Sequence, residues 1–185
     1  MEQITADEAA RLVEDGDAIL ISGSGGGHSV PEALLAAVER RFLAEANPRG
    51  LTSVSVVGVG DRASLGASHL AHEGLLRRAI TSALVDSPGL VRMAANDQIE
   101  AYTLPQGVLS QLMRDMAAGR PGLLTKTGLG TFVDPRQQGA RQSPRTPPAF
   151  VEVVTLAGEE WLFFKPVPVN VAFLRGTTHR ATASR

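Results

Sequence analysis

The feature that most constrains the fold is a strand, glycine loop, helix and strand in the first third of the chain. Residues 18–21 form a short continuous apolar run, typical of a strand buried on both faces of a parallel sheet. The run breaks into Ser-Gly-Ser-Gly-Gly-Gly at residues 22–27. A helix with apolar residues at helical spacing is predicted from after Ser29 to about Glu45, and residues 51–57 form a second β-rich run. Because parallel neighbours need a crossover connection, this order predicts a βαβ unit.

Two sequence patterns predict where the first helices begin. Thr5 with Glu8, and Ser29 with Glu32, have the Thr/Ser-x-x-Glu spacing of a capping box. The first pattern predicts a short helix that ends near Asp15, and the second predicts the start of the longer helix.

Strand and helix patterns alternate along the rest of the chain. Helical patterns cover residues 72–78, 90–96 and 105–118, and strand patterns cover residues 79–85, 99–104 and 169–174. Residues 150–156 and 161–164 flank Ala157-Gly158 and predict a β-hairpin. Residues 137–149 hold three prolines without apolar periodicity, which predicts an exposed loop. The predicted fold is α/β: an open, mostly parallel sheet covered by helices, with a late β-hairpin.

Composition and charge exclude several classes of protein. Lys and Arg number 18 against 19 Asp and Glu, a net charge of -1, so neither a nucleic acid nor a membrane surface is an expected partner. The chain has no cysteine, which excludes disulfides, thiolate metal sites and cysteine nucleophiles. No apolar run approaches the roughly 18 residues of a spanning helix, and the first residues do not form a secretion signal. We expect a cytoplasmic protein.

Glycine-rich loops are the first candidate binding elements. Three of them follow strand-like runs, at residues 23–27, 58–60 and 128–130. Ligands of parallel sheets bind beyond the carboxyl ends of the strands, and glycines leave backbone amides open to an anion or a developing oxyanion. The first loop matches neither the dinucleotide fingerprint nor the P-loop. We predict a ligand contact at Gly25, Gly26 and Gly27, with a tight turn as the alternative.

Two further segments contribute candidate binding residues. Gln106 lies in a Pro-Gln-Gly sequence at a strand-to-helix junction, where its amide could contact a polar ligand. A second set precedes or follows an Asp-Pro turn: Gly128, Gly130, Thr131 and Arg136. The Arg136 guanidinium is a candidate carboxylate or phosphate contact, with a salt bridge to Asp134 as the alternative.

Neither the histidines nor the carboxylates form a catalytic pattern. His69 and His72 lack the spacing of a zinc hydrolase helix, so a structural or surface role is favoured for both. His28, beside the first glycine loop, is the one histidine that merits a functional test. No Gly-x-Ser-x-Gly elbow is present. Five carboxylates lie near loops without forming an acidic motif: Asp61, Glu73, Asp86, Glu100 and Asp134.

Several of these segments together resemble the family I coenzyme A transferases, particularly the single-chain acetate/3-oxoacid and propionate type. The resemblance is carried by Gly58-Val-Gly-Asp-Arg62, His72-Glu-Gly-Leu-Leu76, Tyr102-Thr-Leu-Pro-Gln-Gly-Val108 and Gly128-Leu-Gly-Thr-Phe-Val-Asp-Pro-Arg-Gln-Gln-Gly139. It runs from about Thr5 to Thr178 and is most specific in Gly-Thr-Phe-Val-Asp-Pro-Arg. It implies the fold of the α-subunit-like half of that family.

The resemblance also implies a chemistry. A glutamate of the family attacks an acyl-CoA thioester and then holds coenzyme A as a glutamyl thioester, from which a second acid takes it. That glutamate lies in the β-subunit-like half, whereas this chain resembles the first half, so no catalytic residue is assigned here. The expected substrates are acyl-CoA and small carboxylic acids, with no permanently bound cofactor. The expected partner is a β-like half or subunit, and an oligomer is expected.

Three other functions stay open at this point. The chain could be a non-catalytic remnant that acts as a binding or scaffold module, an acyl-CoA thioesterase, or a relative of sugar-phosphate isomerases. Residues 179–185 are polar and do not resemble the family continuation, which would fit a truncated or frame-shifted reading. The predicted division is therefore a domain at residues 1–178 and an unstructured tail at 179–185.

Overall fold

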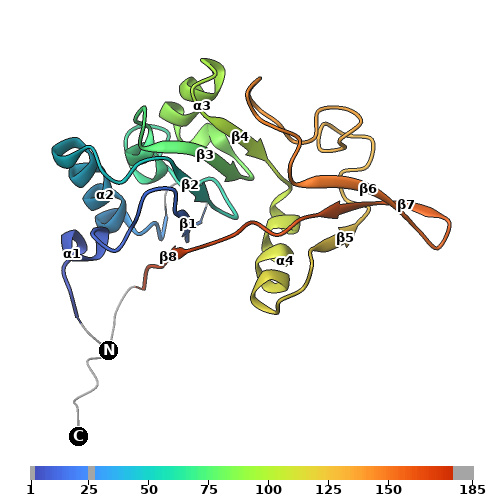
Figure 1. Ribbon diagram of the computed structural model, residues 1–185, viewed down its shortest axis with the longest axis horizontal. Helices are drawn as coiled ribbons and strands as arrows, with labels where there is room; N and C mark the ends of the chain where they lie inside the picture. The colour runs from blue at the N-terminus through green and yellow to red at the C-terminus, as the bar shows by residue number, and fades with distance from the viewer. Residues whose placement is uncertain (1–2, 25–27, 177–185) are drawn as a thin grey trace, which may run out of the picture.

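The larger sheet of the protein is parallel, as predicted. The computed structural model describes residues 3–24 and 28–176. Five parallel strands lie in the order β4-β3-β2-β1-β8 (Figure 1). Their bounds are β1 Ala18–Ile21, β2 Leu51–Val54, β3 Leu76–Thr81, β4 Glu100–Thr103 and β8 Val171–Phe173. The predicted βαβ unit is confirmed, because β1 and β2 pair in parallel with a helix between them.

Helices cover the two faces of this sheet unequally. The first face, which includes Ile19, Ile21, Ala79 and Ala101, packs into one core cluster with most of the helices. Those helices are α1 Ala6–Ala10, α2 Glu32–Glu45, the 3-10 helix η2 Gly66–Leu70 and α3 Pro88–Ala95. The second face packs against α4 Gln106–Ala117 in a separate cluster.

A small antiparallel sheet lies beside α4, at the right of Figure 1. Its order is β5-β7-β6, with β5 Leu123–Thr125, β6 Val151–Leu156 and β7 Glu159–Phe164. The β6–β7 hairpin is confirmed, and its turn residues Ala157 and Gly158 both have positive φ angles, 53° and 79°. Strand β5 was not predicted, since three residues carry too short a pattern.

The predicted helix at residues 72–78 is wrong. The chain turns there, with Gly74 at a positive φ of 87°, and β3 begins at Leu76, which pairs with Leu51. The predicted strand at residues 79–85 is therefore displaced toward the N-terminus, and a 3-10 helix, η3 Leu84–Asp86, occupies its end.

Only the first of the two predicted capping boxes forms. Thr5 and Glu8 cap α1 reciprocally, although this helix is shorter than expected. At α2 the N-cap is Pro31, with no side-chain hydrogen bond, and Ser29 has a positive φ of 55°. The Glu32 carboxylate reaches across to accept the Gly66 amide at 2.9 Å rather than back toward Ser29.

The segment at residues 137–149 is irregular, as predicted, but it is not simply exposed. Thr103 donates its amide to the Ala140 carbonyl at 2.9 Å, and the isolated bridge between Tyr102 and Arg141 lies on the outer edge of β4. The Tyr102 hydroxyl donates to the Pro147 carbonyl at 2.5 Å, and burial raises the pKa of Tyr102 to about 12. This segment closes one edge of the sheet.

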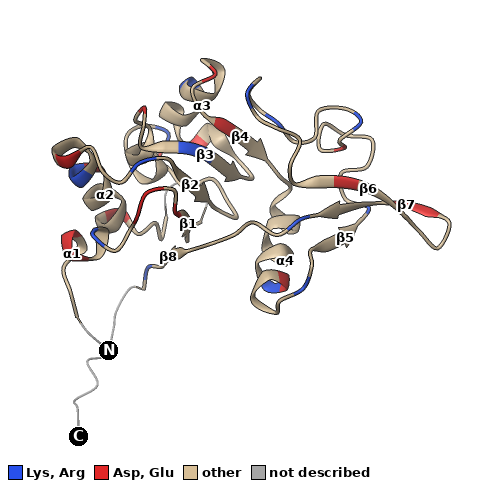
Figure 2. Cartoon of the chain, viewed as in Figure 1, with Lys and Arg blue, Asp and Glu red and all other residues tan. Residues whose placement is uncertain are grey.

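Charges are scattered over the described chain. Figure 2 shows Lys and Arg interspersed with Asp and Glu on both sheets. Within residues 3–24 and 28–176, no helix is both long enough and apolar enough to span a bilayer. The predicted tail at 179–185 and the boundary at Thr178 lie outside the described residues and stay predictions.

Candidate functional site

The carboxyl edge of the parallel sheet is the candidate site. Strands β1 to β4 run in the same direction, so the loops that follow them meet at one edge. We use "carboxyl edge" for these loops: residues 22–24, 55–60, 82–87 and 104–107. They include parts of two of the segments that carried the family resemblance, residues 58–62 and 102–108.

Two of these loops are locked together by direct contact. A Cβ atom at Gly58 would collide with the Asp86 carboxylate and the Ala83 carbonyl, and one at Gly60 would collide with the Asp86 carbonyl. The two glycines are therefore needed for close packing between loops 55–60 and 82–87. This explains the second glycine loop without a ligand.

The carboxylate beneath these loops is engaged within the chain. Asp86 is buried, at 7% exposure, and Arg62 donates to it from Nε at 3.2 Å. Asp61 accepts the amides of Ala63 and Leu65 at 2.9 and 3.0 Å, and these backbone hydrogen bonds lower the pKa of Asp61. Both carboxylates hold the loop in place.

The structure places Gln106 on the carboxyl edge, as predicted. It is the first residue of α4, and it is exposed. Pro105 is the N-cap and contributes no side-chain hydrogen bond, and a Cβ atom at Gly107 would meet no atom within 4 Å. The first turn of α4 therefore presents backbone amides and the Gln106 side chain at this edge, which suits a negatively charged group.

The first glycine loop lies only partly within the described residues. Gly25, Gly26 and Gly27 lie outside them, so their predicted ligand contact stays a prediction. On either side, Ser24 donates its amide to the His28 carbonyl at 2.8 Å, and the two form an antiparallel bridge.

The Gly128 to Arg136 segment packs against the small sheet. The Gly130 amide donates to Asp134 at 3.0 Å, and the Thr131 hydroxyl donates to the Gly128 carbonyl at 2.7 Å. A Cβ atom at Gly128 would lie 3.2 Å from Leu162 of β7. These predicted contacts are close to one another, and their polar groups are used in a local turn.

Arg136 makes the salt bridge that was its alternative interpretation. Its guanidinium donates to both carboxylate oxygens of Asp134, at 3.0 and 2.8 Å, and to Glu160 at 3.0 Å. The Asp134 side chain is 2% exposed. The Arg136 hydrogen bonds hold the pKa of Asp134 well below its usual range. The guanidinium is thus committed to two carboxylates of this chain.

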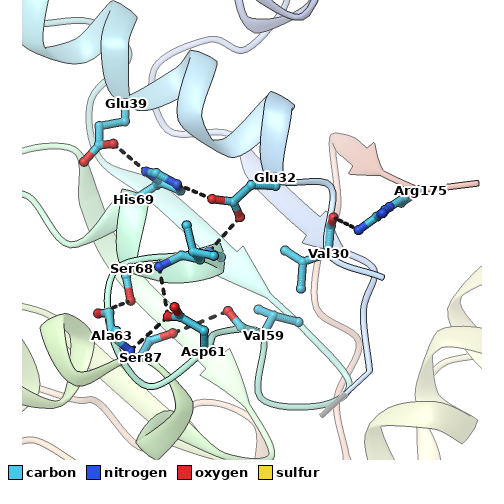
Figure 3. A network of polar contacts seen from close by, with 12 residues as sticks. Val30, Glu32, Glu39, Val59, Asp61, Ala63, Ser68, His69, Ser87 and Arg175 are labelled. Atoms are coloured by element: carbon cyan, nitrogen blue, oxygen red, sulfur yellow. Dashed lines mark hydrogen bonds and ion pairs between the residues drawn. The ribbon is translucent and has the colours of Figure 1, made fainter. Parts of the chain in front are cut away.

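A cluster of histidines and glutamates joins α2 to η2 and the residues after it, and Figure 3 shows its Glu32–His69–Glu39 part. His69 faces Glu32 through Nε2 at 2.6 Å and Glu39 through Nδ1 at 2.5 Å, and His72 Nε2 lies 2.6 Å from Glu39. Burial lowers the pKa of His69, but the two carboxylates outweigh it and the net shift is upward. Burial likewise opposes the net lowering of the Glu39 pKa by His72 and His69. A structural role, as favoured from the sequence, fits this geometry.

The sequence pattern did not identify this cluster as a unit. Its signal was the spacing: Glu32 and Glu39 are seven residues apart on one helical face, and His69 and His72 are three apart. Only the packing of α2 on η2 brings the two pairs together. Among the described residues, no group of three or more His, Cys, Asp or Glu has the arrangement of a metal site.

Similarity to known proteins extends over nearly the whole chain. The coenzyme A transferase family model matches residues 3–182. The acetate CoA-transferase YdiF of Escherichia coli K12 is 37% identical over 175 residues, which cover 95% of this chain and 33% of that protein. The acetate CoA-transferase subunit alpha of the same strain is 28% identical over 174 residues, covering 93% of this chain and 68% of that subunit.

Solved structures agree with this similarity. YdiF of Escherichia coli O157:H7, solved as an apoenzyme and as a thioester complex with CoA, matches at a TM-score of 0.91 and 37% identity. The match covers 94% of this chain and 34% of that one. The chain thus spans about a third of the length of the first relatives it matches, and the predicted family resemblance and fold class are confirmed.

Proposed function

The chain belongs to the coenzyme A transferase family, and from this membership we propose that it is the α-like part of an enzyme that moves coenzyme A between a short-chain acyl-CoA and a carboxylic or 3-oxo acid. The observation that carries the proposal is the match, at a TM-score of 0.91, to one third of a transferase that has been solved as a thioester with CoA. Coenzyme A is a substrate in this proposal. A cytoplasmic location stays a prediction.

The proposed reaction divides between two parts of the enzyme. A glutamate on a β-like part attacks the thioester carbonyl, which forms a mixed anhydride and releases CoA thiolate. The thiolate then attacks the glutamyl carbonyl, which releases the first acid and leaves a glutamyl thioester. The acceptor acid regenerates acyl-CoA and the glutamate by the reverse path. No net oxidation occurs, and each step exchanges one acyl bond for another.

The carboxylates at the carboxyl edge support placing the nucleophile elsewhere. A nucleophile needs a carboxylate oxygen free to attack. Asp86 is buried under Gly58 and bound to Arg62, and Asp61 accepts two amides of its own loop. Asp86 is therefore not available without unfolding the loop that it holds, and the exposed Asp61 is engaged through its Oδ1 in fixing its own loop.

The role we propose for this chain is to stabilise negative charge in the substrate and transition states. The first turn of α4 has no side-chain cap. Its backbone amides and the Gln106 side-chain amide lie at the carboxyl edge, where they would stabilise a developing oxyanion. Gly25, Gly26 and Gly27 remain proposed contacts of the same kind. For Gly128, Gly130, Thr131 and Arg136 we propose a role in the turn that they build, because the Gly130 amide, the Thr131 hydroxyl and the Arg136 guanidinium have partners within it or beside it.

The experiment is a CoA-transfer assay with the chain alone and in complex. The 185-residue chain is co-expressed with the part of YdiF outside the matched third, and transfer from acetyl-CoA to an acceptor acid is measured. We expect transfer only by the complex. Gln106→Ala should lower kcat/KM about 10- to 100-fold, whereas Gln111→Ala, also exposed on α4, should have no effect.

Two results would contradict the proposal. Turnover by the chain alone would show that it carries its own nucleophile. Release of free acid and CoA by the complex without an acceptor would indicate a thioesterase.

A further inference from the structure

The Glu32 carboxylate joins two elements beside the carboxyl edge. Glu32 is the first residue of α2, shortly after the segment that contains the first glycine loop. One of its oxygens lies 2.6 Å from His69 Nε2, as Figure 3 shows, and the other accepts the Gly66 amide at 2.9 Å. Gly66 and His69 both belong to η2. The two oxygens of Glu32 therefore fix the start of α2 against η2.

The start of η2 packs directly on loop 55–60. The Ala67 amide donates to the Val59 carbonyl at 2.7 Å, and Gly66 has a positive φ of 66°. A Cβ atom at Gly66 would lie 2.3 Å from the Val59 carbonyl oxygen. Because the two backbones are in contact, a displacement of Gly66 is transmitted to loop 55–60.

The same loop also contacts the segment before α2. A Cβ atom at Gly23 would lie 2.8 Å from Val59 Cγ1 and 3.4 Å from Val30 Cγ2. Val30 precedes Glu32 by two residues. Gly23, Val30 and Val59 thus form one packed junction, and the Glu32 carboxylate ties together the two chain segments that meet there. The position of Gly23 relative to loop 55–60 therefore depends on the partners of Glu32.

The contact of Glu32 with His69 depends on the protonation of the ring. His69 also faces Glu39 through Nδ1, so both ring nitrogens lie against carboxylate oxygens. The imidazolium donates from both nitrogens, whereas the neutral ring has one N–H group. Neutral His69 therefore directs one nitrogen lone pair at a carboxylate oxygen at hydrogen-bonding distance, and that contact becomes repulsive.

The charges around His69 favour its cationic form. Burial opposes this form, but the hydrogen bonds with Glu32 and Glu39 outweigh burial and raise the pKa of His69 above 6.5. His72 Nε2 shares Glu39, at 2.6 Å. Helix α3 also packs on η2, and its charged residue, Arg92, forms no ion pair with this cluster within the described residues. The contact of His69 with both carboxylates is therefore complete below pH 6.5 and is lost as the pH rises through the raised pKa of His69.

We propose that Glu32 is a positioning residue, which holds Gly23 and loop 55–60 of the carboxyl edge in register for CoA transfer only while His69 is cationic. The inference rests on the proposed function. It is supported by a carboxylate shared between a titrating ring and the Gly66 amide, and by the packing of Gly66 on the edge loop. CoA transfer should therefore fall on the alkaline side, although His69 itself lies outside the carboxyl edge.

Replacement of Glu32 by glutamine reverses the preference of this site. The Gln amide oxygen can still accept the Gly66 amide, and the Gln NH₂ group can donate to the free nitrogen of neutral His69. Cationic His69 would instead place two donors against each other. Glu39→Gln has the same effect at the other ring nitrogen and leaves the Gly66 contact in place. Both variants therefore suit the neutral ring.

The first test is the pH profile of CoA transfer by the complex with the unmatched part of YdiF, between about pH 6 and pH 9. We expect kcat/KM of the wild type to fall about tenfold across the alkaline limb. Glu32→Gln and Glu39→Gln should move that limb to higher pH, whereas a merely structural role would lower activity equally at every pH. Glu45→Gln is the matched control and should follow the wild-type profile, since Glu45 lies on α2 and pairs with Arg11 and Arg41.

The second test does not depend on CoA transfer. Hydrogen exchange of the Ala67 amide, which donates to Val59, is measured on the full 185-residue chain and referred to the intrinsic exchange rate at each pH. We expect the protection of Ala67 in the wild type to fall by about tenfold as His69 becomes neutral. In Glu32→Gln and Glu39→Gln the protection should persist at alkaline pH.

The two measurements separate this inference from the proposed function. Parallel pH profiles of the wild type and both glutamine variants would overturn the inference, as would Ala67 protection that does not change with pH. Ala67 protection that behaves as expected in a protein without CoA transfer would refute the proposed function and leave the Glu32 link standing. CoA transfer with pH-independent protection would do the reverse. If Glu32→Gln does not fold, Glu39→Gln decides both measurements.

Discussion

Individual residues at the carboxyl edge show how a glycine pattern can have a packing cause. Gly58 lies against the Asp86 carboxylate, while Gly107, which follows two strands later in the sequence, has open space around it. Both belong to segments that carried the family resemblance. The sequence pattern does not distinguish the two glycines, because only the fold decides which one packs against other residues and which one has open space beside it.

Gly58→Ala should therefore destabilise the protein by about 1 to 3 kcal/mol, since the new methyl group overlaps Asp86 and the Ala83 carbonyl. Gly107→Ala, inside α4, should leave stability unchanged or raise it by up to about 1 kcal/mol. Urea unfolding of the two variants checks the difference. Equal effects would mean that loops 55–60 and 82–87 are not packed as described.

The Asp134–Arg136 pair has a predictable pH signature. Because the pKa of Asp134 is lowered, its stabilisation is present above its ordinary value of 3.8 and is lost as the pH falls below it. Asp134→Asn should cost about 2 kcal/mol more than Glu160→Gln at neutral pH, since Asp134 is buried and Glu160 is 55% exposed. Unfolding measured from pH 7 to pH 3 should show the Asp134→Asn deficit shrinking; a constant deficit would contradict the pair's role.

At the scale of elements, long apolar patterns were predicted well and short ones were not. The structure confirms the predicted helix at residues 105–118 and the two hairpin strands. Each of these segments repeats its apolar pattern several times, which makes the prediction strong. Residues 72–78 were predicted as a helix on one weak turn of pattern, and pairing of Leu76 with Leu51 overrides that local preference. The burial of Thr146 in an otherwise polar, proline-rich segment likewise depends on β4.

Thr146 is a direct test of that segment. Its hydroxyl accepts the Ala101 amide at 2.9 Å and lies 2.6 Å from the Ser143 hydroxyl. Thr146→Val keeps the shape but leaves the Ala101 amide unpaired, so it should destabilise by about 1 to 3 kcal/mol. Thr155→Val, on the exposed part of β6, should change stability little. Thermal or urea unfolding distinguishes them, and equal stabilities would show that the segment does not close β4.

The α2–η2 contact should weaken in alkaline solution. Both ring nitrogens of His69 face carboxylates, so the cationic form is favoured and its pKa is raised above 6.5. The stabilisation is complete below pH 6.5 and is lost as the pH rises through the shifted value. His72 and Glu39 belong to the same cluster, and the lowered pKa of Glu39 adds stability that is lost as the pH falls below 4.5.

His69→Gln should therefore flatten the dependence of unfolding free energy on pH above 6.5. His28→Gln is the control, since the His28 ring takes part in none of these contacts. Urea titrations at several pH values between 6 and 9 provide the measurement. Parallel curves for wild type and His69→Gln would exclude the Glu32–His69–Glu39 contact as the source.

For the whole molecule, the parallel sheet and the family resemblance followed from the sequence, whereas the order of the strands did not. Alternation of buried runs with helical segments predicts parallel strands, but it does not give their order. The position of β8 beside β1 arises only in three dimensions. The candidate site could also be predicted only in part. Gln106 lies on the carboxyl edge, whereas the Arg136 guanidinium binds Asp134 and Glu160 of this chain.

The central claim is that this chain contributes fixed dipoles to a CoA-transfer site and leaves the acylated side chain to another part of the enzyme. Intact-mass spectrometry after incubation with acetyl-CoA tests it most directly. The account predicts an unchanged mass for the purified 185-residue chain and, in the complex, a covalent CoA adduct confined to the complementary polypeptide. An adduct on any aspartate or glutamate of this chain would contradict it.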